Sequence, residues 1–202
     1  DIIARAVEIV GVEYVYDTEQ GVSYRVLADH ARATAFLLAD GVFPSNEGRG
    51  YVLRRILRRA VRHAWLLGRR EPTLAGVVEA VVGRMGVAYP ARLSRREYIV
   101  SNPRAEEEPY LPTIDAGMKR FDEIAPTGGS GTIAGKDVFK LYDTFGFPVD
   151  LTELMAQERG YSIDLEGFET ELEAQRRRSR EDRAASGIAV EAHALRDGWE
   201  SV

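Results

Sequence analysis

Residues 44–67 constrain the fold more than any other segment, because they read as a polar loop punctuated by glycine and followed by an amphipathic helix. At about 100° per residue from Tyr51, the arginines of this helix fall within an arc of about 140°, and aliphatic side chains fill the remainder. The segment therefore predicts a helix with one face in a core and a basic opposite face. The arginines on that face are Arg54, Arg55, Arg58, Arg59 and Arg62.

Two interpretations of the basic face are open. Like charges four residues apart, as at Arg54 and Arg58, cost a few tenths of a kcal/mol per pair in an isolated helix. A phosphate backbone would offset that repulsion, since guanidinium groups bind phosphate in a bidentate way. Tyr51 and Trp65 add flat rings that could stack on bases, and His63 borders the arc. Alternatively, the face is solvated, or acidic segments at 106–108 or 166–173 pack over it.

The overall charge does not exclude a nucleic-acid partner. The chain of 202 residues has a formal net charge of −5, yet residues 41–70 hold eight arginines against one glutamate. Binding of a polyanion depends on the local field rather than on the sum. Cysteine is absent, which excludes disulfides and thiolate metal sites and favours a reducing, cytoplasmic location. The sequence has no segment typical of a secretory signal or membrane span.

Hydrophobic periodicity predicts a mainly α protein, a helical bundle with a small irregular or β-containing element near 128–148. Helical spacing covers residues 2–10 up to Gly11, 23–40 with Ser23 as the cap, 51–68 and 73–85. Three further helices are expected at 113–124, 148–159 and 164–183. Because Pro103, Pro109 and Pro112 interrupt helices, residues 86–112 are expected to be an irregular connector with one short helix near 93–99.

The other motifs in the sequence do not predict a cofactor-binding, metal-binding or catalytic site. Residues 129–134 fit the loose form of a dinucleotide-binding fingerprint, but no hydrophobic strand precedes them, so a flexible surface loop over 126–135 is the better interpretation. The three histidines, His30, His63 and His193, are far apart and lack the spacing of metal-binding helices. We therefore expect neither a metal site nor a catalytic group.

Two blocks carry a resemblance to a known family. Residues 25–63, which include the sequence Phe-Pro-Ser-Asn-Glu-Gly-Arg-Gly-Tyr, and residues 140–152, Lys-Leu-Tyr-Asp-Thr-Phe-Gly-Phe-Pro-Val-Asp-Leu-Thr, resemble the alanyl-tRNA synthetases in their helical tRNA-recognition region. These class II enzymes activate alanine with ATP and charge a tRNA that they identify through a G·U wobble pair in its acceptor stem. The resemblance implies that Asn46 and Asp143 contact this pair. It also implies that neighbouring side chains hold the backbone, namely Arg49, Tyr51, Arg54, Arg55, Arg58, Arg59, Arg62 and His63.

The resemblance also implies a domain organisation. Residues 1–11 would end a preceding catalytic domain, which binds ATP and magnesium, and 12–160 would form the recognition domain. Residues 161–202 would be a charged helix and linker toward an editing domain with a zinc site. We therefore expect no cofactor in this chain and no aminoacylation by it alone. The prolines within 98–112 depart from the long helix of the family. A different interpretation is a helical protein-interaction domain, or a decayed paralogue, that docks an acidic partner.

Overall fold

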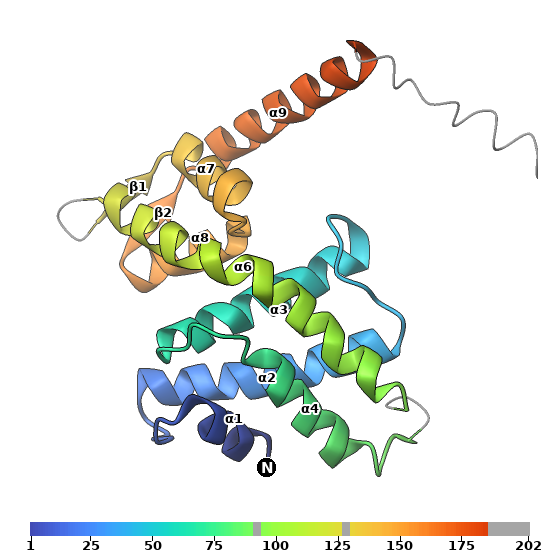
Figure 1. The fold of residues 1–202 in the computed structure, drawn as a ribbon. Helices are drawn as coiled ribbons and strands as arrows, with labels where there is room; N and C mark the ends of the chain where they lie inside the picture. The colour runs from blue at the N-terminus through green and yellow to red at the C-terminus, as the bar shows by residue number, and fades with distance from the viewer. Residues whose placement is uncertain (91–93, 127–129, 186–202) are drawn as a thin grey trace, which may run out of the picture.

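The computed structural model describes residues 1–90, 94–126 and 130–185, which form eight helices and a two-stranded parallel sheet (Figure 1). The expected mainly α class, with a small β-containing element, is confirmed. The elements are α1 (Ile2–Val10), α2 (Glu19–Ala39), α3 (Gly48–Leu66), α4 (Leu74–Met85), α6 (Arg96–Ile124), β1 (Gly131–Ile133), α7 (Gly135–Phe145), α8 (Val149–Glu158), β2 (Tyr161–Ile163) and α9 (Leu165–Ala185).

Helices α1 to α4 build the first hydrophobic core, to which α6 adds Ile99. Gly11 ends α1 in the left-handed conformation, as expected. Helix α2 begins earlier than predicted, because Thr18 rather than Ser23 caps it, with Oγ1 accepting from the Gly21 N–H at 3.0 Å. Helix α3 begins at Gly48, one turn before the predicted start.

The prediction of an irregular connector is wrong over residues 96–112. Helix α6 runs for 29 residues through all three prolines, and no short helix ends near residue 99. An interior proline costs about 3 kcal/mol in a helix, but packing of an amphipathic face supplies most helical stability in proteins. That face was present in the sequence at helical spacing: Ile99, Pro103, Glu107, Tyr110, Ile114, Met118 and Phe121 are all buried. Residue 93 lies outside the described residues.

The acidic run 106–108 is not a solvated segment, because Glu107 points into the interior and caps another helix. Only 1% of this residue is exposed. Its Oε1 accepts from the N–H groups of Thr73 and Leu74 at 2.9 Å, and Oε2 accepts from Ala75 at 3.1 Å. These are first-turn donors of α4, which the side chain of Thr73 leaves uncapped. Burial raises the pKa of Glu107, and the three backbone donors act against that rise.

A second core lies between the C-terminal half of α6, α7, α8 and the sheet. Strand β1 pairs in parallel with β2 in the register Gly131 to Tyr161, so part of the expected loop 126–135 is a strand, and residues 127–129 lie outside the described residues. This pairing joins segments on either side of residue 160. In Figure 1, α6 passes from the α1–α4 group into this second group, and α9 projects away from it. The rest of the expected linker, beyond residue 185, is also outside the described residues.

Candidate functional site

The loop before α3 packs tightly against the first turn of that helix. A Cβ atom at Gly50 would lie 2.1 Å from the carbonyl oxygen of Phe43 and 2.2 Å from Oγ of Ser45, so only glycine permits this approach. The loop is closed further by Ser45, whose Oγ donates to the Glu47 carbonyl at 2.8 Å. Asn46 is exposed on this loop, and its Oδ1 accepts a hydrogen bond from Nη1 of Arg54.

Asp143 and a hydrogen-bond partner of Asn46 line the same cleft, although Asn46 and Asp143 lie 97 positions apart in the sequence. The cleft, of about 320 Å³, lies where α3, α6 and the end of α7 meet. Asp143 is exposed and lines it directly, whereas Asn46 joins it through its hydrogen bond to Arg54. The residues that line the cleft are Arg54, Arg58, Glu106, Pro109, Tyr110, Thr113, Asp143, Thr144, Phe145 and Gly146.

Acidic side chains compensate much of the basic face of α3. Glu106 accepts from Nε and Nη2 of Arg54 at 3.1 and 2.9 Å. On α8, Asp150 and Glu158 approach Arg55 and Arg62, each at 2.6 Å. The expectation that 106–108 might cover the arginines is therefore partly correct, whereas the ion pairs on the other side come from α8 rather than from 166–173.

Arg58 serves the fold as well as the cleft. Its Nη1 donates to the carbonyl oxygen of Gly146, and its guanidinium carbon lies 5.1 Å from the centre of the Tyr110 ring. Burial is the main cause that lowers the pKa of Arg58 from its ordinary value. Because this arginine fixes α7 against α3 and α6, its removal would alter the cleft itself as well as any contact to a ligand.

The other predicted contacts differ in accessibility. Arg49 is exposed on the first turn of α3 beside Asn46, and Arg59 is half-buried further along the helix. Tyr51 is half-buried, with the guanidinium carbon of Arg55 at 5.8 Å from its ring centre. Desolvation by burial raises the pKa of the Tyr51 hydroxyl. Of this group, Arg49 is therefore the side chain best placed to meet a ligand.

Arg62 and His63 do not lie where the sequence suggested. Only 4% of Arg62 and 6% of His63 is exposed, because the start of α2 and the end of α8 flank this part of α3. Ser23 Oγ lies 3.1 Å from Nδ1 of His63. Burial, followed by the positive charge of Arg62, lowers the pKa of His63 to about 3. The buried, uncharged imidazole is therefore poorly suited to a phosphate contact.

The lowered pKa of His63 predicts that acid destabilises the fold. Above pH 6.5 the imidazole is neutral in both states, and below it only the unfolded chain takes up the proton until the pH reaches about 3. We expect this residue to remove about 2 kcal/mol of unfolding free energy between pH 7 and pH 5. Urea denaturation of the wild type and of His63→Gln at both pH values measures it. An equal loss in both proteins would contradict the prediction.

At the cleft, the sequence interpretation missed Gln175 and considered Glu106 only as part of the acidic run 106–108. Gln175 on α9 donates from Nε2 to Oδ1 of Asp143 at 2.7 Å, and Glu106 pairs with Arg54. Glu106 could have been found by continuing the helical period through the prolines, because it then shares the α3-facing side of α6. No spacing in the sequence links Gln175 to Asp143, since the contact joins two helices 32 residues apart.

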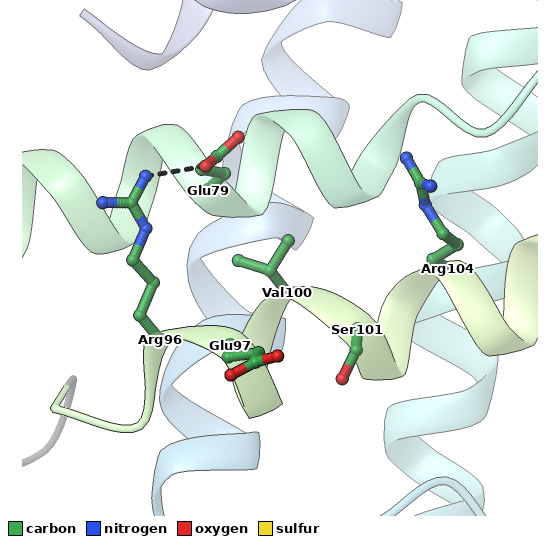
Figure 2. Close-up of a pocket in the computed structure, with 6 residues that line it drawn as sticks. All are labelled: Glu79, Arg96, Glu97, Val100, Ser101 and Arg104. Atoms are coloured by element: carbon green, nitrogen blue, oxygen red, sulfur yellow. Dashed lines mark hydrogen bonds and ion pairs between the residues drawn. The ribbon is translucent and has the colours of Figure 1, made fainter.

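A second hollow lies between α4 and the start of α6, and Figure 2 shows its six lining residues. Arg96 and Arg104 stand at its two ends, with Val100 between them, and Arg96 pairs with Glu79 at 2.6 Å. None of these residues lines the cleft of Asp143. Within the described ranges, no cluster of three or more histidine, aspartate or glutamate side chains is placed to hold a metal ion. No helix in those ranges is long and apolar enough to cross a membrane.

The family model described as tRNA synthetases class II (A) matches residues 1–200. The chain belongs to this family.

The curated relatives narrow the class further. An alanine–tRNA ligase from Xylella fastidiosa is 51% identical over 179 residues, which are 89% of this chain and 20% of the relative. An alanine–tRNA ligase from Xanthomonas oryzae pv. oryzae is 52% identical over 171 residues, which are 84% of this chain and 19% of the relative. The chain thus spans about one fifth of the length of the curated relatives it matches.

Proposed function

We propose that the chain is the part of an alanine–tRNA ligase that recognises the acceptor stem of its tRNA, and that the cleft between α3, α6 and α7 receives the G·U wobble pair. The observation that carries this proposal is that Asp143 lines this cleft and that Asn46 is hydrogen-bonded to Arg54, another residue of the lining. The similarity to alanine–tRNA ligases over most of the chain supports it. We assign no catalytic group or cofactor to these residues, and aminoacylation would require the rest of the ligase.

The two polar side chains suit the chemistry of a wobble pair. A carboxylate such as Asp143 accepts hydrogen bonds only, and the guanine amino group of a G·U pair is a donor in the minor groove. Asn46 already accepts from Arg54 through Oδ1, which leaves its amide nitrogen as a donor toward a base or ribose oxygen. Arg49 stands beside Asn46 and would contact the phosphate backbone. Arg54 and Arg58 line the cleft and would maintain its shape.

Asp143→Ala should abolish the preference for a G·U stem over a G·C stem. The variant removes the acceptor without touching the core, because Asp143 is exposed at the end of α7. Gel-shift titration of two minihelix RNAs, which differ only at that pair, measures the ratio of the two affinities. We expect the ratio to fall to about one, since a single base contact supplies about 1–3 kcal/mol of discrimination. A ratio equal to that of the wild type would overturn the assignment of Asp143.

Arg49→Gln is the matched variant for backbone contact. It should weaken binding of both stems by the same factor and reduce the slope of log affinity against log salt by about one. Arg58 is less suitable for this test, because its guanidinium group also donates to the Gly146 carbonyl. Docking of an acidic protein partner is disfavoured, since Glu106, Asp150 and Glu158 already face the arginines of α3.

A further inference from the structure

Helix α9 is anchored only by its first part. Asp164 caps its start, with Oδ1 accepting from the Gly167 N–H at 2.9 Å, and Phe168 is buried against the second core. Leu172 packs against the same core as its last apolar contact within the described residues. Beyond it the helix continues to Ala185 and projects away from the body of the protein (Figure 1). Among the described residues, none beyond Leu172 belongs to either hydrophobic core.

Gln175 connects the start of the projecting part to the candidate cleft. Its Nε2 donates to Oδ1 of Asp143 at 2.7 Å, and the glutamine is half-buried although Asp143 is exposed. A carboxylate held through Oδ1 has fewer accessible rotamers and presents Oδ2 for a further donor. Gln175 is thus placed to position Asp143 rather than to contact a ligand itself.

A run of exposed arginines follows this glutamine directly. Residues 174–180 read Ala-Gln-Arg-Arg-Arg-Ser-Arg and contain no acidic residue. Arg176, Arg177, Arg178 and Arg180 are all exposed. Within the described ranges, Arg177 has only a 3.9 Å pair with Glu181, and the other three have no ion pair.

This arrangement contrasts with α3, whose arginines were the obvious candidates from the sequence. There, Arg54, Arg55 and Arg62 have carboxylate partners at 2.6–2.9 Å. On α9, at about 100° per residue, Arg176 and Arg178 lie on either side of the line through Gln175, and Arg180 lies one turn above Arg176. Arg176 and Arg178 therefore flank the Asp143-facing side of α9, and Arg180 extends the Arg176 side by one turn.

We propose that the exposed arginines of α9 form a second RNA-contacting surface, which binds the phosphate backbone next to the base pair that Asp143 reads, and that Gln175 is the positioning residue for Asp143. The inference rests on the proposed function. It assigns most of the backbone attraction to α9, where Arg176, Arg178 and Arg180 have no ion pair within the described residues. Arg49 would add to it from the start of α3, and the other arginines of α3 build the cleft. Such contacts are independent of sequence, so they raise the affinity for every stem alike.

The surface is tested with the triple variant Arg176→Gln, Arg178→Gln and Arg180→Gln. The control is the triple variant Arg5→Gln, Arg84→Gln and Arg96→Gln, which changes the net charge equally on α1, α4 and the start of α6. Gel-shift titrations of the G·U and G·C minihelices at several salt concentrations give the affinities. We expect the α9 variant to weaken both stems equally and to lower the salt slope by one to three units, and the control to change it by less than half a unit. Equal slopes in the two triple variants would overturn the inference.

Gln175→Leu tests the positioning role of Gln175. The readout is the preference for the G·U stem, which general destabilisation of the fold would not change. The leucine keeps the volume but cannot donate to Asp143, so we expect the G·U preference to fall several-fold while the salt slope stays unchanged. An unaltered preference would overturn this role. Loss of preference in Asp143→Ala with no effect of the α9 variants would leave the proposed function standing and reject only the inference. Failure of the wild type to bind either minihelix would overturn both.

Discussion

Glu107→Ala is expected to lower the free energy of unfolding by about 3–4 kcal/mol, one of the two largest effects of a single substitution that the structure suggests. The carboxylate is buried and accepts from three consecutive N–H groups at the start of α4. Alanine would leave those donors without partners and add a cavity between α4 and α6. It would also remove a negative charge from the positive end of the α4 dipole. Urea denaturation followed by circular dichroism measures the loss.

Two control variants distinguish the loss of the α4 cap from a general effect of substitutions in α6. Glu108→Ala, next to it on the exposed side of the helix, should change stability by no more than about 0.5 kcal/mol. Glu107→Gln should lose about half as much as alanine, because the amide oxygen can still accept from Thr73 and Leu74 while its NH2 group faces the Ala75 donor. If Glu107→Ala and Glu108→Ala behave alike, the carboxylate does not hold α4.

Gly135→Ala is expected to cost about 3 kcal/mol, because α7 and α9 meet there backbone to backbone. A Cβ atom at this position would lie 2.3 Å from the carbonyl carbon of Gly167 and 2.3 Å from the nitrogen of Phe168. Main-chain atoms cannot rotate away, so α9 would have to shift. The shift would also strain Asp164, whose carboxylate accepts from the N–H groups of both Gly135 and Gly167. Thermal and urea unfolding of the variant measure the cost.

Gly83→Ala is the matched control, with the opposite sign expected. Gly83 lies within α4, is exposed, and has no atom within 4 Å of an added Cβ. Alanine there should raise stability by about 0.5–1 kcal/mol through the lower entropy of the unfolded chain and the better helix propensity. A loss of stability in both glycine variants would contradict the close approach of α7 and α9.

Periodicity located most helices because each buries a stripe at 3.6-residue spacing, and glycines marked ends such as Gly11. It failed over 96–112, where the local effect of three prolines was given more weight than the buried stripe that passes through them. Helix starts were displaced for a related reason. Both Thr18 and Ser23 satisfy the local rule for a cap of α2. Thr18 makes the cap, whereas Ser23 makes a tertiary contact with His63.

The sequence pattern identified the basic face but not its partners. Which acids compensate Arg55 and Arg62 depends on how α8 docks against α3, and no local pattern determines that. His63 was expected at an accessible edge because a helical projection shows the direction of a side chain but not what covers it. The pairing of Asn46 and Asp143 came from resemblance to a family. In the structure Asp143 lines the cleft and Asn46 is linked to it through Arg54, and their contact with RNA stays a prediction.

The length of α6 has a mechanical consequence. At 1.5 Å per residue its 29 residues extend for about 43 Å, and they contribute Ile99 to one core and Phe121 to the other. Neither core can melt without shortening the helix that the other requires, so heat or denaturant should unfold the chain in a single cooperative step. Below the unfolding temperature, α6 keeps the helices that line the cleft at a constant separation. A nucleic acid would then dock onto a preformed shape with little reorganisation.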